Sequence, residues 1–487
     1  MCNTVAAQFS LAPGGFVTVK EGGSLMIGTD LEIQSVSGSS GYLVDNTIDG
    51  DITITGDILV ERYMTADMWH NVASPVSNEN SSCFAGTDLV FYYDETIILN
   101  DWNFGWVMYS GNLEEFRGYD VYFYTNPVTV NYEATGSESI NTGSYSIGVT
   151  ITDVPNGEIP SHKGWNLVGN PYPSPVDWLA SSGWGKSDIN DAKYIWDGTN
   201  DVYTIFLGGG APVGLNGGTR YIPSNQGFWV QAVTTGNFSI NNAVRIGDIS
   251  GTPDFYKSDD FDYPLLSLIS SGYGFEDEII VRFIEGTTNG FDLNYDAAKL
   301  FSMNNEVPQL SIIHGGDAMA LNTYPELKED LGIDLNFQCS KAGYYTIEIT
   351  DRTNIEYPDE IYLKDNLENQ IINLSETISY NFKHEPRTGS GRFKLWFNPN
   401  EDIKNNLNPE SYFKVHAYKN VITILKNTVK DITGSILVRN MLGETVFFKS
   451  LENSREVNYN VNLPTGYYIV SIISEEHRSN SKILIVN

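Results

Sequence analysis

Short runs of β-prone residues recur along the whole chain and constrain its fold more than any other feature. The runs are four to seven residues long, and glycine, asparagine and aspartate separate them. Within runs such as Phe16–Val19 and Ile52–Thr55, polar and apolar residues alternate, which is the period of a strand with one buried face. One helical turn is expected, at Tyr295–Phe301. The chain is therefore predicted to be an all-β, multi-domain protein.

Length and composition bound the number of domains and the possible partners. The chain has 487 residues, too many for one core, so three or four domains are expected. Hydrophobic residues make up 41% and aromatic residues 13%, which excludes global disorder. Basic residues number 29 against 61 acidic ones, a net charge of −32. Such a surface repels nucleic acid and anionic lipid, so neither is a predicted partner.

The runs and their separators predict four domains. The asparagine-rich and charged stretch 398–409 is the clearest linker. The predicted domains are a β-roll or small sheet at 1–62, an internally duplicated Trp-rich β domain at 63–250, a two-sheet β-sandwich at 255–400, and a C-terminal Ig-like sandwich at 408–487.

The second domain contains two copies of one sequence pattern. The matching segments occur in the same order in each copy: Trp69–Pro75 with Trp165–Pro171, Tyr93–Thr96 with Trp196–Thr199, and Gly118–Tyr122 with Gly227–Gln231. One copy alone would leave an apolar face exposed. We therefore expect the two copies to pack about a pseudo-twofold axis.

The pattern of the last residues of the chain predicts a small antiparallel β-sandwich. Runs Val421–Asn427, Ser435–Phe447, Leu463–Ile472 and Lys482–Asn487 alternate in polarity, with turn residues between and within them. The order of these runs resembles the type A-like C-terminal sorting domain of proteins that the Bacteroidetes type IX secretion system exports. The resemblance is carried by Leu442, Gly443, Leu463, Pro464, Gly466, Tyr468 and Lys482.

That resemblance implies a destination and a partner. Proteins with this domain reach the cell surface or the extracellular space, and the domain docks on outer-membrane components, a shuttle barrel or the translocon. Phrases such as Gly164–Pro175 and Ile222–Phe228 are similar to those in large secreted Bacteroidetes surface proteins. An N-terminal segment, Val5–Gln8, looks like the end of a signal peptide.

No motif in the sequence indicates an enzyme. The G-x-S-x-G, H-E-x-x-H and P-loop patterns are absent, and the six histidines lack metal-ligand spacing. Asp94 and Asp197 are equivalent carboxylates in the two copies, but an aspartate that begins a D-x-T turn more often closes a hairpin. We therefore predict a non-enzymatic structural protein or adhesin, which contacts itself or other surface proteins. A polysaccharide-degrading enzyme is the second alternative.

Carbohydrate binding is the first alternative. Aromatic rings stack on the apolar faces of sugars, and Trp102, Trp106 and Trp184 lie in segments that can present such rings. Core packing explains these three tryptophans equally well. A lectin-like protein that binds a polysaccharide therefore remains an alternative.

Calcium is the one cofactor that the sequence suggests. Oxygen-rich loops contain the candidate ligands Asp49, Asp51, Asp197 and Asp201. None of these loops has the EF-hand pattern, because the bidentate glutamate is missing. A structural calcium ion is thus a hypothesis. Of the three cysteines, Cys83 and Cys339 are expected to be isolated thiols, and Cys2 belongs to the signal-like segment.

Overall fold

The computed structural model divides the chain into two compact units, each described by itself. The first unit comprises residues 1–327, 333–356 and 378–391, and the second comprises 328–332, 357–377 and 392–487. The described residues are 8–47, 51–87, 89–97, 102–124, 126–136, 138–152, 163–247, 263–355, 359–386, 391–400, 413–426, 434–451, 456–474 and 478–486.

The predicted all-β class is confirmed. Helical structure in the described ranges is confined to single 3-10 turns: η1 (Ser81–Cys83), η2 (Glu95–Ile97), η3 (Trp102–Gly105) and η5 (Asn242–Val244). None of the helices in this part of the chain has the length and apolar character needed to span a bilayer. Cys83 and Cys339 are free thiols, as predicted. Cys2 and the Val5–Ala7 part of the signal-like segment lie outside the described residues.

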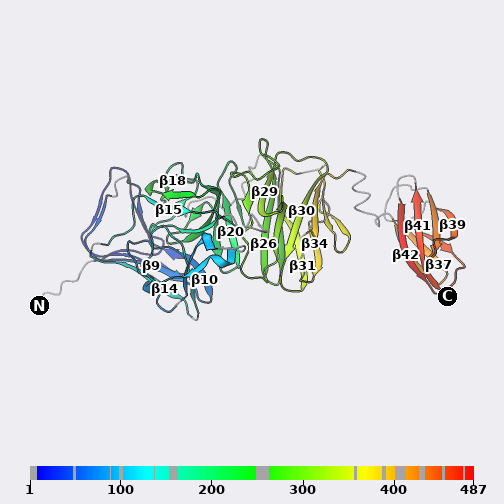
Figure 1. The fold of residues 1–487 in the computed structure, drawn as a ribbon, viewed down its shortest axis with the longest axis horizontal. Coiled ribbons are helices and arrows are strands. Elements are labelled where there is room, and N and C mark those ends of the chain that lie inside the picture. The colour runs from blue at the N-terminus through cyan, green and yellow to red at the C-terminus, as the bar shows by residue number, and fades with distance from the viewer. Residues whose placement is uncertain are drawn as a thin grey trace. The chain divides into compact units, whose positions relative to one another are not determined.

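The N-terminal strands form three parallel stacks that wind as a short β-helix (Figure 1). The stacks are β1 (Phe9–Leu11), β4 (Leu31–Ile33) and β9 (Ile58–Met64); β2 (Phe16–Val19) and β7 (Tyr42–Asp45); and β3 (Leu25–Ile27) and β8 (Ile52–Ile54). The chain turns once around the coil between paired strands, so parallel pairing needs no crossover helix. A two-stranded hairpin, β5 (Ser35–Val36) with β6 (Ser39–Ser40), lies between β4 and β7 and hydrogen-bonds to β9 through Ser35.

An antiparallel strand closes this β-helix. Strand β14 (Val128–Ala134) pairs along the whole of β9, and β9 crosses residue 62, where the sequence placed a domain boundary. The hydrophobic core continues from Leu31 and Ile33 of the β-helix to Tyr119 and Val121 of the next domain. The first two predicted domains therefore share one core.

Two sheets of equivalent topology follow. Their strand orders are β10-β13-β11-β12 and β16-β23-β19-β20-β21, so corresponding strands occupy corresponding places. The strands are β10 (Met68–Val72), β11 (Val90–Tyr93), β12 (Trp106–Met108), β13 (Tyr119–Phe123), β16 (Trp165–Gly169), β19 (Ile189–Asp197), β20 (Val202–Leu207), β21 (Val213–Leu215) and β23 (Gly227–Ala232). The register also matches, because Val72 pairs with Tyr119 and the equivalent Val168 pairs with Phe228.

Symmetric backbone contacts join the two copies. Val72 of the first copy bridges Gln226 of the second, and Val168 of the second bridges the equivalent Arg117 of the first. The duplicated sequence thus folds with the expected pseudo-twofold relation. Small sheets flank the second copy: β15 (Tyr145–Val149), β24 (Gly236–Ile240) and β18 (Trp184–Gly185), and β17 (Val176–Asp177) with β22 (Tyr221–Ile222).

The rest of the first unit is one continuous ladder in the order β30-β28-β29-β26-β25-β31-β34. Its strands are β25 (Leu265–Gly272), β26 (Phe275–Phe283), β28 (Gln309–His314), β29 (Asp317–Tyr324), β30 (Leu331–Gln338), β31 (Gly343–Thr353) and β34 (Ser379–His384). The sequence predicted two separate sheets here. Instead the ladder curls, so that Phe337 of β30 contacts Tyr345 and Phe382 at the other end, with ring centres 5.3 and 5.0 Å apart.

The helical turn expected at Tyr295–Phe301 is wrong. Ala297 and Ala298 form the short strand β27, which pairs with β29. Both carboxylate oxygens of Asp296 accept backbone N–H groups, from Asp292 at 2.7 Å and from Thr323 at 2.6 Å. These bonds tie the segment to the sheet, a tertiary effect that local propensity does not report.

The second unit contains three strands of the middle region and the C-terminal domain. Strands β33 (Gln370–Asn373), β32 (Ile361–Asp365) and β35 (Phe393–Phe397) pair in that order. The C-terminal domain has two sheets (Figure 1), β36-β37-β40 and β39-β38-β41-β42. These strands are β36 (Phe413–Tyr418), β37 (Val421–Lys426), β38 (Gly434–Asn440), β39 (Thr445–Leu451), β40 (Glu456–Asn460), β41 (Gly466–Ser474) and β42 (Arg478–Ile485).

Candidate functional site

The C-terminal motif residues fall into two groups, and the first group builds the fold. Leu463 and Tyr468 are buried in the core between the two sheets. The hydroxyl of Tyr468 donates a hydrogen bond of 2.9 Å to the carbonyl of Pro464. This bond closes the loop that leads through Gly466 into β41, so these residues shape the domain from within.

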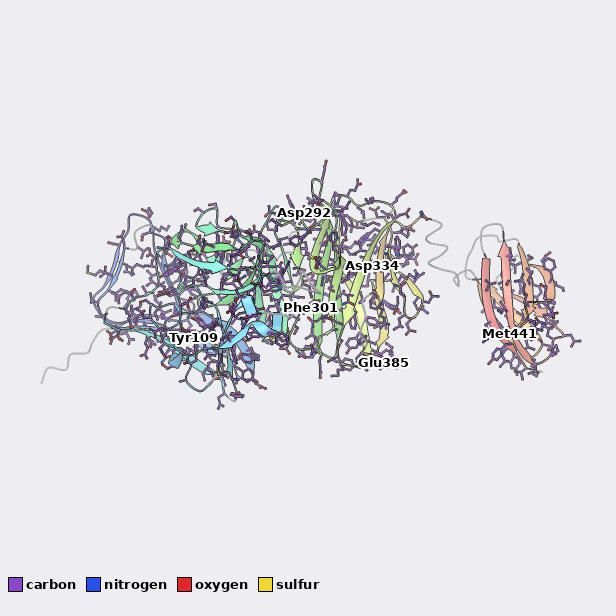
Figure 2. The ribbon with its side chains drawn as sticks, viewed as in Figure 1. Tyr109, Asp292, Phe301, Asp334, Glu385 and Met441 are labelled. Atoms are coloured by element: carbon purple, nitrogen blue, oxygen red, sulfur yellow. The ribbon has the colours of Figure 1, made fainter. Side chains whose placement is uncertain are left out.

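The second group is exposed at the β38–β39 hairpin. Leu442 is 87% exposed, and Met441 beside it, labelled in Figure 2, is also exposed. The side-chain oxygen of Asn440 accepts the backbone N–H groups of Leu442 and Glu444, both at 3.0 Å. Gly443 has φ of 86°, which a residue with a side chain rarely adopts. The tip is therefore held in one conformation with an apolar side chain in water.

Further apolar side chains are exposed on the outer face of the four-stranded sheet. Ile469 of β41 lies opposite Lys482 of β42, and Tyr467 lies opposite Leu484. The Lys482 ammonium lies 4.4 Å from the centre of the Tyr467 ring, a cation–π contact. We call the exposed set the sorting surface, defined as Leu442, Phe448, Tyr467, Ile469, Lys482 and Leu484. Contiguous exposed apolar groups of this kind mark interaction sites.

The tryptophans suggested for sugar binding mostly pack inward. Trp106 makes edge-on contacts with Tyr93 and Trp229, with ring centres 5.3 and 5.5 Å apart. Trp184 stacks on Phe238 at 5.5 Å and is half-buried. The Trp102 side chain lies outside the described residues. Trp69, Trp165, Trp178, Trp196 and Trp229 are buried or half-buried as well. The described tryptophans therefore form no exposed platform.

The suggested calcium ligands do not gather into one site, and some of them already accept hydrogen bonds. Asp49 lies outside the described residues, and Asp51 is exposed. Asp201 accepts a hydrogen bond of 2.7 Å from the Asn304 amide. Within the described ranges, no three His, Cys, Asp or Glu side chains cluster closely enough to hold a metal ion. The calcium hypothesis stays a prediction without a defined ligand set.

Asp94 and Asp197 close equivalent turns, as the alternative to catalysis predicted. Asp94 accepts the Thr96 backbone N–H at 3.0 Å, and Asp197 accepts the Thr199 N–H at 2.9 Å. Each turn follows a β-strand in its own copy. These hydrogen bonds give both carboxylates a structural role.

A groove in the first unit was not anticipated from the sequence. It has a volume of about 580 Å³ and lies between the loops of the second copy and the β25–β26 hairpin. Its lining includes Glu276 and Glu278, which share the outward face of β26 because they are two residues apart. The signal that could have found it is the Glu-Asp-Glu run, whose alternation places two acids outward and one inward.

Hydrogen bonds fix the groove's inner carboxylate. Asn216 donates its backbone N–H to Glu278 at 2.7 Å, and its side-chain oxygen accepts the Glu278 N–H at 2.9 Å. Burial raises the pKa of Glu278 above its usual range. On the opposite face of β26, Asp277 forms a buried ion pair with Lys299 at 2.6 Å. This strand therefore joins the second copy to the ladder.

Comparison with protein families agrees with the division between body and tail. Residues 418–487 match the family described as a secretion system C-terminal sorting domain. The fold and the motif residues thus define a secreted all-β protein that the type IX secretion system sorts to the cell surface or the extracellular space, a route characteristic of Bacteroidetes. Residues 2–397 match a domain of unknown function (DUF8693), and the chain belongs to that family. No curated protein matches the chain.

Proposed function

We propose that the exported protein is a non-enzymatic structural or adhesive component of the cell surface. The observation that carries the proposal is the continuity of the cores in the first unit. One core runs from the β-helix into the first copy, and another runs from Trp165 and Trp229 of the second domain to Leu265 and Leu321 of the ladder. Such continuity suits a scaffold that transmits load better than domains that move about a cleft.

Buried polar contacts add a further junction, between the β-helix and the region around the second copy. Arg245, after β24, donates to the Leu43 carbonyl in the β-helix at 2.7 Å and to the Ser174 hydroxyl at 3.0 Å. Asp45 of β7 accepts the Thr142 hydroxyl at 2.5 Å. Buried charged groups of this kind are costly unless they are satisfied, and here they hold two domains together.

The arrangement of carboxylates also favours a non-enzymatic role. Glycoside hydrolysis needs two carboxyl groups on opposite sides of the scissile bond. Glu276 and Glu278 of the groove lie side by side on one strand, and Asp94 and Asp197 each close a turn. Neither pair has the opposed geometry.

In this proposal the sorting surface docks on an outer-membrane component of the secretion machinery, and the body then contacts other copies or other surface proteins. Deleting the gene tests the surface role. Mutant cells should lose adhesion or surface integrity, and re-expression of the full chain should restore it. Normal adhesion and normal envelope properties in the deletion strain would refute the proposed role, as would polysaccharide hydrolysis by the purified chain.

A further inference from the structure

We propose that the groove between the second copy and the β25–β26 hairpin binds a neutral, hydroxyl-rich saccharide chain. This inference rests on the proposed adhesive role, to which it gives a ligand class. The volume of about 580 Å³ lies within the range of sites that bind small molecules. It is distinct from the tryptophan segments to which the sequence directed attention.

The floor of the groove presents two carboxylates and one hydroxyl group. Ser271 of β25 lies opposite Glu276 of β26, and Ile269 lies opposite Glu278. All four side chains line the groove. Carboxylate oxygens accept hydrogen bonds from hydroxyl groups, and a serine hydroxyl both donates and accepts. Two carboxylates about 7 Å apart along one strand can therefore hold hydroxyls of neighbouring parts of a sugar chain.

The inner part of this floor is preorganised. Glu278 accepts the Asn216 N–H and the hydroxyl of Ser267, which in turn contacts the Thr350 hydroxyl at 2.8 Å. Because these partners fix the carboxylate before a ligand arrives, binding costs little side-chain entropy at this position. Glu276 is exposed and remains available to a ligand.

Apolar groups provide the second element of sugar recognition. Half-buried Ile269 lies on the floor beside Glu278, and Val202 lies on the wall from the second copy. The C–H face of a pyranose ring packs on such surfaces, while its hydroxyls reach the carboxylates. Gly217, Gly272 and Gly274 keep the rim free of side chains.

The charge of the groove lining and the pairing of its strands argue against two other classes of ligand, acidic polymers and extended peptides. The lining contains two carboxylates and no Lys, Arg or His, so uronic acid and sulfated polymers are repelled. A peptide that binds by strand addition needs an unpaired strand edge. β25 pairs with β31 along the floor, and on β26 the Glu278 N–H already donates to the side-chain oxygen of Asn216. A saccharide needs no such edge.

Binding by the purified full chain tests the inference. Calorimetry with glucan, mannan and xylan hexasaccharides, in buffer with EDTA, should give measurable affinity for at least one, and none for oligogalacturonate or a heparin hexasaccharide. Glu276→Gln should weaken that affinity about tenfold, the effect of losing a charge-assisted hydrogen bond. Glu285→Gln, an exposed glutamate just beyond β26, is the matched control and should bind as the wild type does.

Four outcomes would overturn the inference: no neutral ligand bound, preference for the acidic chains, equal affinity in all variants, or occupancy of the groove by a lysine-rich peptide instead. Cell adhesion assays distinguish a wrong assignment of the groove from a wrong assignment of the adhesive role. If groove variants adhere normally while deletion cells do not, the groove assignment is wrong and the adhesive role stands. If the purified chain binds sugar through the groove while deletion cells adhere normally, the adhesive role is wrong.

Discussion

Ala73 and Gly169 occupy equivalent positions in the two copies and meet at the pseudo-twofold axis. A Cβ atom on Gly169 would lie 2.3 Å from the Ala73 Cβ. The two backbones make equivalent hydrogen bonds, Ala73 N–H to Asn225 at 3.0 Å and Gly169 N–H to Phe116 at 3.1 Å. Two side chains cannot share the axis, so the duplicated sequence differs at this pair for a steric reason.

Substituting Gly169 with alanine is expected to destabilise the fold. The added methyl group would overlap Ala73, and overpacking of a tight core typically costs about 1–3 kcal/mol. Urea denaturation of the purified body should show the loss as a lower midpoint. Gly148→Ala is the matched control, because a Cβ there meets nothing within 4 Å, and its midpoint should match that of the wild type.

The swap of the two residues tests the symmetry directly. Gly169→Ala combined with Ala73→Gly moves the single methyl group to the other side of the axis. We expect the double variant to recover part of the lost stability, since the Arg117 carbonyl, 3.0 Å from the new Cβ position, still crowds it. A double variant less stable than Gly169→Ala alone would show that the two residues do not compete for the same space.

Buried Lys193 should make stability depend on alkaline pH. Its side chain is 1% exposed, with the ammonium 5.8 Å from the centre of the Phe206 ring. Burial lowers the pKa of Lys193 to about 7. The unfolded chain binds the proton more tightly, so this residue destabilises the fold most below pH 7. Stability should rise by about 1.4 kcal/mol per pH unit between about pH 7 and 10.

Lys193→Met isolates that contribution. The straight apolar chain fills a similar volume without a charge, so the variant should be more stable than the wild type at pH 7. The difference between the two free energies of unfolding should shrink as the pH approaches 10. A difference that stays constant across this range would mean that Lys193 keeps its ordinary pKa in the fold.

Buried Glu79 should make the stability of the fold decrease as the pH rises through the acidic range, the opposite of the effect of Lys193. Burial raises the pKa of this carboxyl to about 6, although its oxygens accept the N–H groups of Glu133 at 2.6 Å and Asn80 at 2.9 Å. The folded state therefore holds the proton more tightly than the unfolded chain does. Its contribution to stability is present below the unfolded pKa and is lost as the pH rises to about 6, a change of about 2 kcal/mol.

The measurement compares unfolding free energies of the wild type and Glu79→Gln at intervals from pH 4 to 7. The glutamine variant loses one acceptor and should be less stable at low pH, but its curve should lack this decline. Parallel curves would contradict the assigned shift. Asp296 carries a similar shift, to about 6, and remains in both proteins, so the comparison cancels its contribution.

The sequence predicted what depends on local pattern. Alternation identified the strands, and repeated segments identified the equivalent sheets, because both signals lie in neighbouring residues. The terminal motifs identified the sorting domain for the same reason. The D-x-T turns at Asp94 and Asp197 also follow from local hydrogen bonding.

What depends on contacts between distant segments was not predictable. The parallel stacks of the β-helix follow from one coil resting on the next, and the curled ladder follows from Phe337 meeting Phe382. The groove needs Asn216 to approach Glu278, two residues in different domains. The failed helical turn at Tyr295–Phe301 has the same cause, since Thr323 holds Asp296 in the sheet.

The exposed hairpin tip gives the last prediction, which concerns export. Leu442 contributes little to the core, because it is 87% exposed, so Leu442→Asp should leave the domain folded. If the tip docks on an outer-membrane component, a charge there should cause the protein to accumulate in the periplasm, as deletion of residues 413–487 should. Cell fractionation and immunoblotting measure the distribution, and the circular dichroism of the isolated variant checks folding.

Met26→Asp is the matched control for that variant. Met26 is 78% exposed on β3 of the body, so the substitution adds the same charge to a similarly exposed apolar site outside the sorting domain. It should be exported at the wild-type level. Tyr468→Ala should block export by a different route, because it removes a core ring and the hydrogen bond to Pro464, and it should unfold the domain. Normal export of Leu442→Asp would place the docking contact elsewhere on the domain and leave the Asn440-capped tip as a rigid turn only.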